Sequence, residues 1–362
     1  MTAMRQLAFL ICIFLATATA APAAVTPRAL TDERQDLSVG QDVAESQLWL
    51  VSTRRLPHGP INTSRRLLPE VSRYESSAGW RQTTHDELMA AHDRRLTTVV
   101  LVHGNDTDEP AAIAKGLELY QSLVRRSQEA FRLIVWSWPS DYVPGTLRQD
   151  ARIKAERAET DSYYLAQLVS EIDSDEPVGL VGYSFGARVI TGGLHLLGGG
   201  SLAGNTVESA KMSERTPVRV VLMAAALDDD WLVPGHRHGR ALTVVERMVL
   251  LVNPQDRALR WYRFLVPRSG ATALGAHGIS SLNSLGVHRQ KIEQVNVNSY
   301  VGVQHGWSSY VGSPQILEQL KREVLVGSNR GRAQPTNDAA ATPDLGEEAG
   351  EEAAMRINRH GG

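Results

Sequence analysis

The sequence predicts an α/β protein in which a mostly parallel central sheet carries helices on both faces. Short apolar runs alternate along the chain with longer segments whose apolar residues recur at helical spacing. Several runs, such as 97–102, are apolar and β-branched throughout, as expected of parallel strands buried on both faces. The chain has 362 residues, which is long enough to bury a large core.

The expected elements follow one another in a regular order. Strands are predicted at 47–53, weakly near 71–74, and at 97–102, 131–136, 178–181, 218–224, 247–252 and 292–297. Helices are predicted at 83–91, 110–130, 146–172, after Gly186, and at 315–325. Ser313 and Pro314 predict the N-cap and the first position of the last helix.

The first 24 residues resemble a secretory signal peptide. A positively charged start precedes an apolar run at 7–15, and Ala18 to Ala20 offer small residues for cleavage. The protein is therefore predicted to be secreted or periplasmic, with an uncleaved membrane anchor as the alternative. After cleavage we expect no stable membrane span, because the apolar run itself is short. Cys12 is the single cysteine, so no intramolecular disulfide forms.

The remaining chain divides by composition. Residues 25–45 are polar and are predicted to form a linker, and residues 46–326 form the α/β domain. Residues 327–362 are rich in Ala, Gly, Glu and Pro and predict a disordered acidic tail. The oligomeric state is left open.

Charge and motif spacing exclude several classes of function. The net charge of −2 gives no indication of a nucleic-acid partner. His85 and His92 lack the spacing of a zinc-binding His-Glu-x-x-His helix, and His236 and His238 have no third ligand placed by the sequence. The glycines at 198–200 are not followed by the Gly-Lys-Ser of a phosphate loop. We therefore expect no metal and no cofactor.

A Gly-x-Ser-x-Gly pattern stands between an expected strand and an expected helix. Gly182 and Gly186 flank Ser184, which fits a nucleophile elbow. Such a serine sits on a sharp, strained turn, so its neighbours two positions away must be small. Ser184 is therefore the predicted nucleophile; the alternative is a simple turn residue in a nucleotide-binding type of fold.

Other polar residues also follow predicted strands, and the carboxyl ends of parallel strands meet at one edge of a sheet. His305 follows the last strand and is the predicted base, whereas His277 and His288 do not directly follow a strong strand. His103 also follows a strand, and we interpret it as a turn-organising residue.

The acid has two candidates. Asp256 follows the penultimate strand, and Asp228 follows the strand before it. Strand order favours Asp256, and the alternative role of Asp228 is to cap its own turn.

The order Ser184, Asp256, His305 resembles that of the α/β-hydrolase superfamily. The turn His103-Gly104-Asn105 resembles the His-Gly element that follows the third strand of that fold and supplies part of its oxyanion hole.

More narrowly, the chain resembles an uncharacterised bacterial family of α/β-hydrolases over residues 47–325. The elements that carry this resemblance are Ser52-Thr53-Arg54, His103-Gly104-Asn105, Ser137-Trp138-Pro139-Ser140, Gly182 to Gly186, and His305-Gly306-Trp307. Tyr183 departs from the histidine often found there, a difference that we interpret as affecting substrate fit more than chemistry.

The resemblance implies the α/β-hydrolase fold and a serine hydrolase that acts on a small-molecule ester or a lipid-like substrate. The amide of Phe185 would donate to the oxyanion, together with that of Gly104 or Asn105. Two alternatives remain: a catalytically silent binding protein with this fold, and an acyltransferase with the same triad. Four tryptophans would either line an apolar acyl site or belong to the core: Trp138, Trp231, Trp261 and Trp307.

Overall fold

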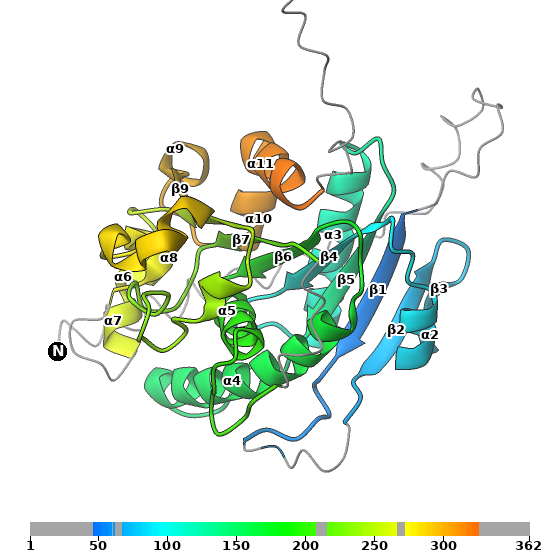
Figure 1. Ribbon diagram of the computed structural model, residues 1–362, viewed down its shortest axis with the longest axis horizontal. Coiled ribbons are helices and arrows are strands. Elements are labelled where there is room, and N and C mark those ends of the chain that lie inside the picture. Colours follow the sequence, from blue (N-terminus) through cyan, green and yellow to red (C-terminus); the bar gives the residue numbers. More distant parts are fainter. Residues whose placement is uncertain (1–45, 60, 62–66, 208–215, 266–271, 326–362) are drawn as a thin grey trace, which may run out of the picture. The chain divides into compact units, whose positions relative to one another are not determined.

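The computed structural model describes residues 46–325, apart from 60, 62–66, 208–215 and 266–271 (Figure 1). The predicted signal peptide, linker and tail lie outside these residues. The chain separates into two compact units, 1–327 and 328–362, and every described residue belongs to the first.

A nine-stranded sheet forms the centre of this unit, in the order β3-β2-β1-β5-β4-β6-β7-β8-β9 (Figure 1). The strands are β1 (Gln47–Ser52), β2 (Glu70–Glu75), β3 (Gly79–Thr83), β4 (Thr97–Val102), β5 (Phe131–Ser137), β6 (Val178–Tyr183), β7 (Val218–Met223), β8 (Arg247–Val252) and β9 (Ile292–Asn296). Strand β2 pairs antiparallel with β1 and β3, and the remaining pairs are parallel.

The predicted α/β class with a mostly parallel sheet is confirmed. Strand β3 was not predicted from the sequence. It forms the edge of the sheet, and its residues are exposed or half-buried, so it carries no apolar run.

The helices are α2 (His85–Ala90), α3 (Glu109–Val124), α4 (Leu147–Glu171), α5 (Gly186–Leu197), α6 (Arg257–Arg260), α7 (Tyr262–Leu265), α8 (Leu274–His277), α9 (Asn298–Val301), α10 (Trp307–Val311) and α11 (Pro314–Val324), with 3₁₀ segments η3 (Ala241–Thr243) and η4 (Leu282–Lys291). Helix α3 ends at Val124, six residues before the predicted end at 130, because the polar residues that follow offer no apolar face. The predicted cap at Ser313 is confirmed, since its Oγ accepts from the Ile316 amide.

Two apolar layers cover the sheet (Figure 1). On β4, Val100 faces the layer that contains α4 and α5, whereas Val99 faces the layer that contains α3 and α11. This alternation follows from the two-residue period of a strand and explains why β4 is apolar throughout. Because β4 to β9 are parallel, their carboxyl ends lie at one edge of the sheet.

No helix in the described part of the chain is both long enough and apolar enough to cross a membrane. Helix α4 has 25 residues, but charged side chains occur along it.

A buried carboxyl group joins α4 to the end of β1. Asp161 is fully buried, and one of its oxygens accepts a hydrogen bond from the Thr53 hydroxyl. Burial raises the pKa of Asp161 from its ordinary value of 3.8 to about 7, although the Thr53 hydrogen bond and the nearby arginines favour ionisation. The folded protein therefore keeps this proton at pH values where the unfolded chain has lost it.

This difference predicts a fall in stability between about pH 4 and pH 7, by up to about 1.4 kcal/mol per pH unit from this group. Below that window the contribution of Asp161 is fully present, and above it the contribution is lost. Asp161→Asn cannot ionise and lacks this slope. Urea unfolding at pH 5 and pH 8 should therefore show the wild type losing more stability than the variant. An equal loss in both proteins would contradict the prediction.

Candidate active site

Ser184 lies at the carboxyl end of β6, where the chain turns directly into α5. Its backbone is left-handed, with φ +53°, a conformation that costs about 1–2 kcal/mol for a residue with a side chain. Two hydrogen bonds to the end of β7 and the loop after it hold the turn: the Ser184 amide donates to Met223 O at 2.9 Å, and Ser184 O accepts from the Ala226 amide at 3.2 Å. The serine is thus held on a strained turn at the carboxyl edge of the sheet, as predicted for a nucleophile elbow.

The two flanking glycines are required for unequal reasons. A Cβ on Gly186 would lie 2.1 Å from Val102 O and 2.7 Å from His103 O, which are backbone atoms at the end of β4. A Cβ on Gly182 would lie 3.0 Å from the Cα of Ala187, a much milder contact. Gly186 therefore sets how closely α5 approaches the end of β4.

Three side chains form a hydrogen-bonded chain at this edge. Ser184 Oγ lies 3.1 Å from His305 Nε2, and His305 Nδ1 lies 2.7 Å from Asp256 Oδ2. The carboxylate accepts from Nδ1–H, which leaves Nε2 as the acceptor for the serine hydroxyl. Asp256 is fully buried, whereas the His305 side chain is 21% exposed. Of this hydrogen-bonded pair, the histidine is therefore the residue that solvent can reach.

Asp256 is held by the backbone that follows it. It caps α6, since Oδ1 accepts from the Leu259 amide at 3.0 Å while Oδ2 contacts His305. Asn253 joins this turn to the segment before His305, because its side-chain amide donates to Gly302 O at 2.9 Å. The acid and the base are therefore held by connected loops.

Asp228, the alternative acid, accepts a hydrogen bond from the Tyr262 hydroxyl at 2.5 Å. The carboxylate in contact with His305 is that of Asp256. Of the three histidines considered as the base, His305 is the one that contacts Ser184. His277 ends the short helix α8, and His288 lies in η4.

Tyr183 contacts the backbone of His305 and helps to position it. Its hydroxyl donates to the main-chain oxygen of His305 at 2.5 Å, and its ring packs edge-on against Trp307 at 5.4 Å. Burial raises the pKa of Tyr183 well above its ordinary value, so the hydroxyl stays a donor. These contacts act on the position of His305, and the expected effect of Tyr183 on substrate fit stays a prediction.

The turn after β4 lies directly beside the elbow. A Cβ on Gly104 would lie 3.0 Å from the Cβ of Ser184 and 2.9 Å from the Tyr183 ring. In the described part of the chain, no acceptor receives a hydrogen bond from the amides of Phe185 or Asn105. These amides are two of the three N–H groups that the sequence predicts as candidates for an oxyanion hole, the third being that of Gly104.

His103 organises this turn, as expected. It is fully buried, its Nδ1 bonds to Gly104 O at 2.9 Å, and its Nε2 accepts from the Trp138 amide at 3.2 Å. Burial lowers the pKa of His103 to about 3, so the ring stays neutral. Trp138 completes the brace by donating from its indole N–H to His103 O at 2.8 Å. The Ser-Trp-Pro-Ser element therefore supports the turn after β4.

Arg188 is a site-adjacent residue that the sequence analysis missed. Its guanidinium group lies 4.7 Å from the centre of the Phe185 ring and 4.8 Å from that of Trp231. Its Nε donates to Ala226 O at 2.6 Å, and another nitrogen donates to the Tyr262 hydroxyl at 2.7 Å. The sequence did contain one indication of its importance: Arg188 is the single arginine of an otherwise uncharged helix and comes four residues after Ser184.

The four tryptophans differ in their positions. Trp138, Trp231 and Trp307 are buried, whereas Trp261 is 40% exposed. The first three pack against His103, Arg188 and Tyr183 respectively and belong to the support of the site.

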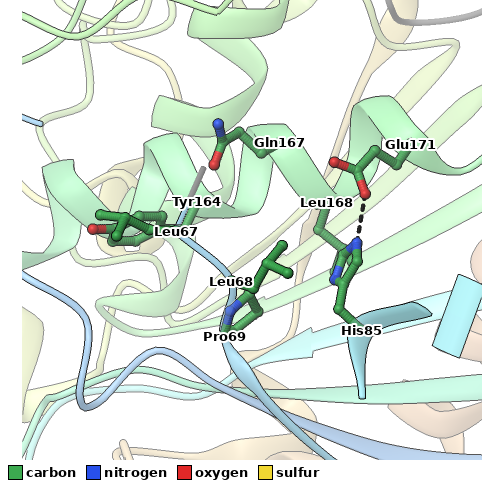
Figure 2. A pocket seen from close by; sticks show the side chains of 8 residues that line it. All are labelled: Leu67, Leu68, Pro69, His85, Tyr164, Gln167, Leu168 and Glu171. Carbon is green, nitrogen blue, oxygen red and sulfur yellow. Dashed lines mark hydrogen bonds and ion pairs between the residues drawn. The ribbon is translucent and has the colours of Figure 1, made fainter. Parts of the chain in front are cut away.

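No group of three or more His, Cys, Asp or Glu in the described residues is arranged to hold a metal ion. Figure 2 shows a small hollow with a polar pair, in which His85 Nε2 lies 2.6 Å from Glu171. Its lining residues are Leu67, Leu68, Pro69, His85, Tyr164, Gln167, Leu168 and Glu171, none of which belongs to the Ser184 site.

The strand order around β6 and the strained turn at Ser184 define an α/β-hydrolase-like fold. Among solved structures, carboxyl esterase 2 of the mycorrhizal fungus Tuber melanosporum is similar, with 13% identity, a TM-score of 0.36, and coverage of 86% of this chain and 94% of that chain. Esterase B of Lactobacillus rhamnosis has 11% identity, a TM-score of 0.35, and coverage of 77% and 86%. The catalytic core domain of Trichoderma reesei acetyl xylan esterase has 12% identity, a TM-score of 0.30, and coverage of 63% and 99%.

No protein-family model matches the sequence, and no curated protein matches it. The resemblance to a particular bacterial family therefore stays a prediction. The similarities to esterases are too distant to assign an activity, so function must be argued from the geometry of this chain.

The contact at Gly186 gives a direct test of the elbow packing. We expect Gly186→Ala to lower the free energy of unfolding by at least about 2–3 kcal/mol, because the added methyl group overlaps backbone atoms that cannot move aside. Gly306→Ala is the matched control, since a Cβ there meets nothing within 4 Å. Urea unfolding of both variants measures the difference, and similar stabilities would contradict the assigned packing.

Proposed function

We propose that this protein is a serine hydrolase that cleaves an ester or related acyl bond. The observation that carries the proposal is the hydrogen-bonded chain from Ser184 Oγ through His305 to the buried Asp256. A serine hydroxyl is a weak nucleophile at neutral pH and needs a base within hydrogen-bond reach. A binding role alone does not require such a chain.

In the first step, Ser184 Oγ attacks the carbonyl carbon of the ester while its proton passes to His305 Nε2. Asp256 keeps the imidazole in the required tautomer and stabilises the imidazolium that forms. The carbonyl oxygen becomes an oxyanion. The amides of Phe185 and of Asn105 or Gly104 are the proposed donors to it.

Collapse of this intermediate breaks the bond between the carbonyl carbon and the leaving oxygen, which takes the proton from His305. The acyl group remains on Ser184. A water molecule then attacks the acyl carbon, again with His305 Nε2 as base, and the acid product leaves as the proton returns to Ser184 Oγ. No cofactor is needed for these steps.

The substrate class that follows is a small-molecule ester or a lipid-like ester. The location that we propose, secreted or periplasmic, rests on the signal-peptide pattern in residues 1–24.

A fluorophosphonate probe tests the activated serine, because it reacts with a nucleophilic serine and loses fluoride. We expect the wild type to be labelled and Ser184→Ala to remain unlabelled. His305→Ala and Asp256→Asn should react roughly a thousandfold more slowly or worse. The measurement is the rate of labelling of purified protein.

Asp228→Asn is the matched control for the acid, because Asp228 bonds to Tyr262. A larger loss in Asp228→Asn than in Asp256→Asn would overturn the assignment of the acid. Absence of labelling in the wild type would overturn the hydrolase and favour a silent binding protein.

The hydroxyl of Tyr183 provides a second test. Tyr183→Phe removes one hydrogen bond to the backbone of His305 and keeps the ring in place. We expect labelling to slow by about five- to tenfold, the size of one net hydrogen bond. Tyr164→Phe is the control, since it also removes a hydroxyl that donates to a backbone oxygen, that of Pro57 at 2.9 Å, and Tyr164 does not belong to the Ser184 site. Equal rates for both variants would contradict the positioning role of Tyr183.

A further inference from the structure

The segment directly after Asp256 has an unusual outer face. Helices α6 and α7 present five exposed side chains, which we call the α6–α7 surface: Arg257, Arg260, Trp261, Arg263 and Phe264. Trp261 is 40% exposed and Phe264 is 44% exposed. Single exposed aromatic residues are ordinary, but a cluster of aromatic rings and arginines indicates an interaction site.

The inner face of the same segment is fixed to the candidate active site. Leu259 and Tyr262 are buried in a small apolar cluster against which Phe185 packs. The Tyr262 hydroxyl also bonds to Asp228, and Asp256 caps α6. The α6–α7 surface therefore has a defined position relative to His305 and Ser184.

The outer face combines positive charge with aromatic rings. The rings of Trp261 and Phe264 lie 5.1 Å apart, and the Arg263 guanidinium lies 4.8 Å from the Phe264 ring. In the described part of the chain, no carboxylate forms an ion pair with Arg257, Arg260 or Arg263. The chain as a whole has a net charge of −2, so this positive charge is local.

The start of α4 extends the surface. Arg148 Nε donates to Phe264 O at 3.0 Å, and α7 lies beside this end of α4 in Figure 1. Leu147 is 42% exposed and Tyr142 is 60% exposed. Both segments follow the carboxyl ends of strands, so the extended surface lies at the same edge of the sheet as Ser184.

We propose that the α6–α7 surface, with Leu147 and Arg148, docks the protein on a membrane that contains anionic lipids. Tryptophan, phenylalanine and arginine side chains suit a lipid–water interface, because their apolar parts enter the boundary while the charged groups meet lipid headgroups. A protein partner would require a complementary acidic surface, and the mixed aromatic and cationic face fits a lipid interface better. The purpose of this docking rests on the proposed function: it would bring the edge of the sheet that carries Ser184 to acyl esters of that membrane.

Vesicle sedimentation tests the docking without the chemistry. The full chain carrying Ser184→Ala is mixed with vesicles of phosphatidylcholine alone, or with about one-third phosphatidylglycerol. We expect at least tenfold tighter binding to the anionic vesicles, and we expect this gain to weaken as salt is raised.

Two double variants in the same background locate the surface. Arg260→Gln with Arg263→Gln should weaken anionic vesicle binding about tenfold or more, because each arginine near the surface contributes electrostatic attraction. Trp261→Ala with Phe264→Ala should weaken binding to a similar degree and leave the salt dependence in place.

Matched controls come from the opposite edge of the sheet. Arg125→Gln with Arg289→Gln removes the same charge just before β5 and β9, and Val287→Ala trims a residue that is 79% exposed. These controls should bind like the parent. Equal losses in the controls and the α6–α7 variants would overturn the proposal.

The proposal also fails if the parent does not bind anionic vesicles. Binding to heparin without vesicle binding, or self-association that the α6–α7 variants abolish, would assign the surface to another partner. Fluorophosphonate labelling of the Ser184-containing protein is measured separately. Vesicle binding without labelling would support the docking proposal and reject the hydrolase proposal. Labelling without vesicle binding would support the hydrolase proposal and reject the docking proposal.

Discussion

The site depends on the close approach of α5 to the end of β4. Gly186 leaves no space for a Cβ beside Val102 O, so the first turn of the helix rests directly on the strand backbone. This contact brings the strained turn at Ser184 against Gly104, although the two residues are far apart in the sequence. The positions of Ser184 and of the predicted oxyanion donors therefore both depend on the absence of a side chain at Gly186.

A set of neutral buried groups supports this arrangement. Burial lowers the pKa of His103 and raises that of Tyr183, so the first remains uncharged imidazole and the second remains uncharged phenol near neutral pH. Each then acts as an uncharged hydrogen-bonding group, His103 on the turn after β4 and Tyr183 on the backbone of His305. In the proposed mechanism, the Asp256 carboxylate is then the group that stabilises an imidazolium at His305.

Asp256 connects the candidate chemistry to the molecular surface. One of its oxygens contacts His305 and the other caps α6, so the same carboxylate orients the histidine and starts the segment that carries the exposed arginines. The inner side of that segment packs toward Phe185, while the outer side presents Trp261 and Phe264. In the proposed docking, the membrane would contact the outer side of the same short segment whose inner side packs toward Phe185.

The class of fold could be predicted from the amino-acid sequence alone, because strands buried on both faces must be apolar throughout, as β4 is. The sequence also placed Ser184, Asp256 and His305 at the same edge of the sheet, because parallel strands end together. The three-dimensional structure was needed to show which carboxylate contacts His305, because strand order places a residue at an edge of the sheet and does not give the direction of its side chain. The roles of Tyr183 and Arg188 could not be predicted either, because their partners are distant in the sequence. Strand β3 was missed for another reason: it lies at the exposed edge of the sheet and therefore has no apolar pattern.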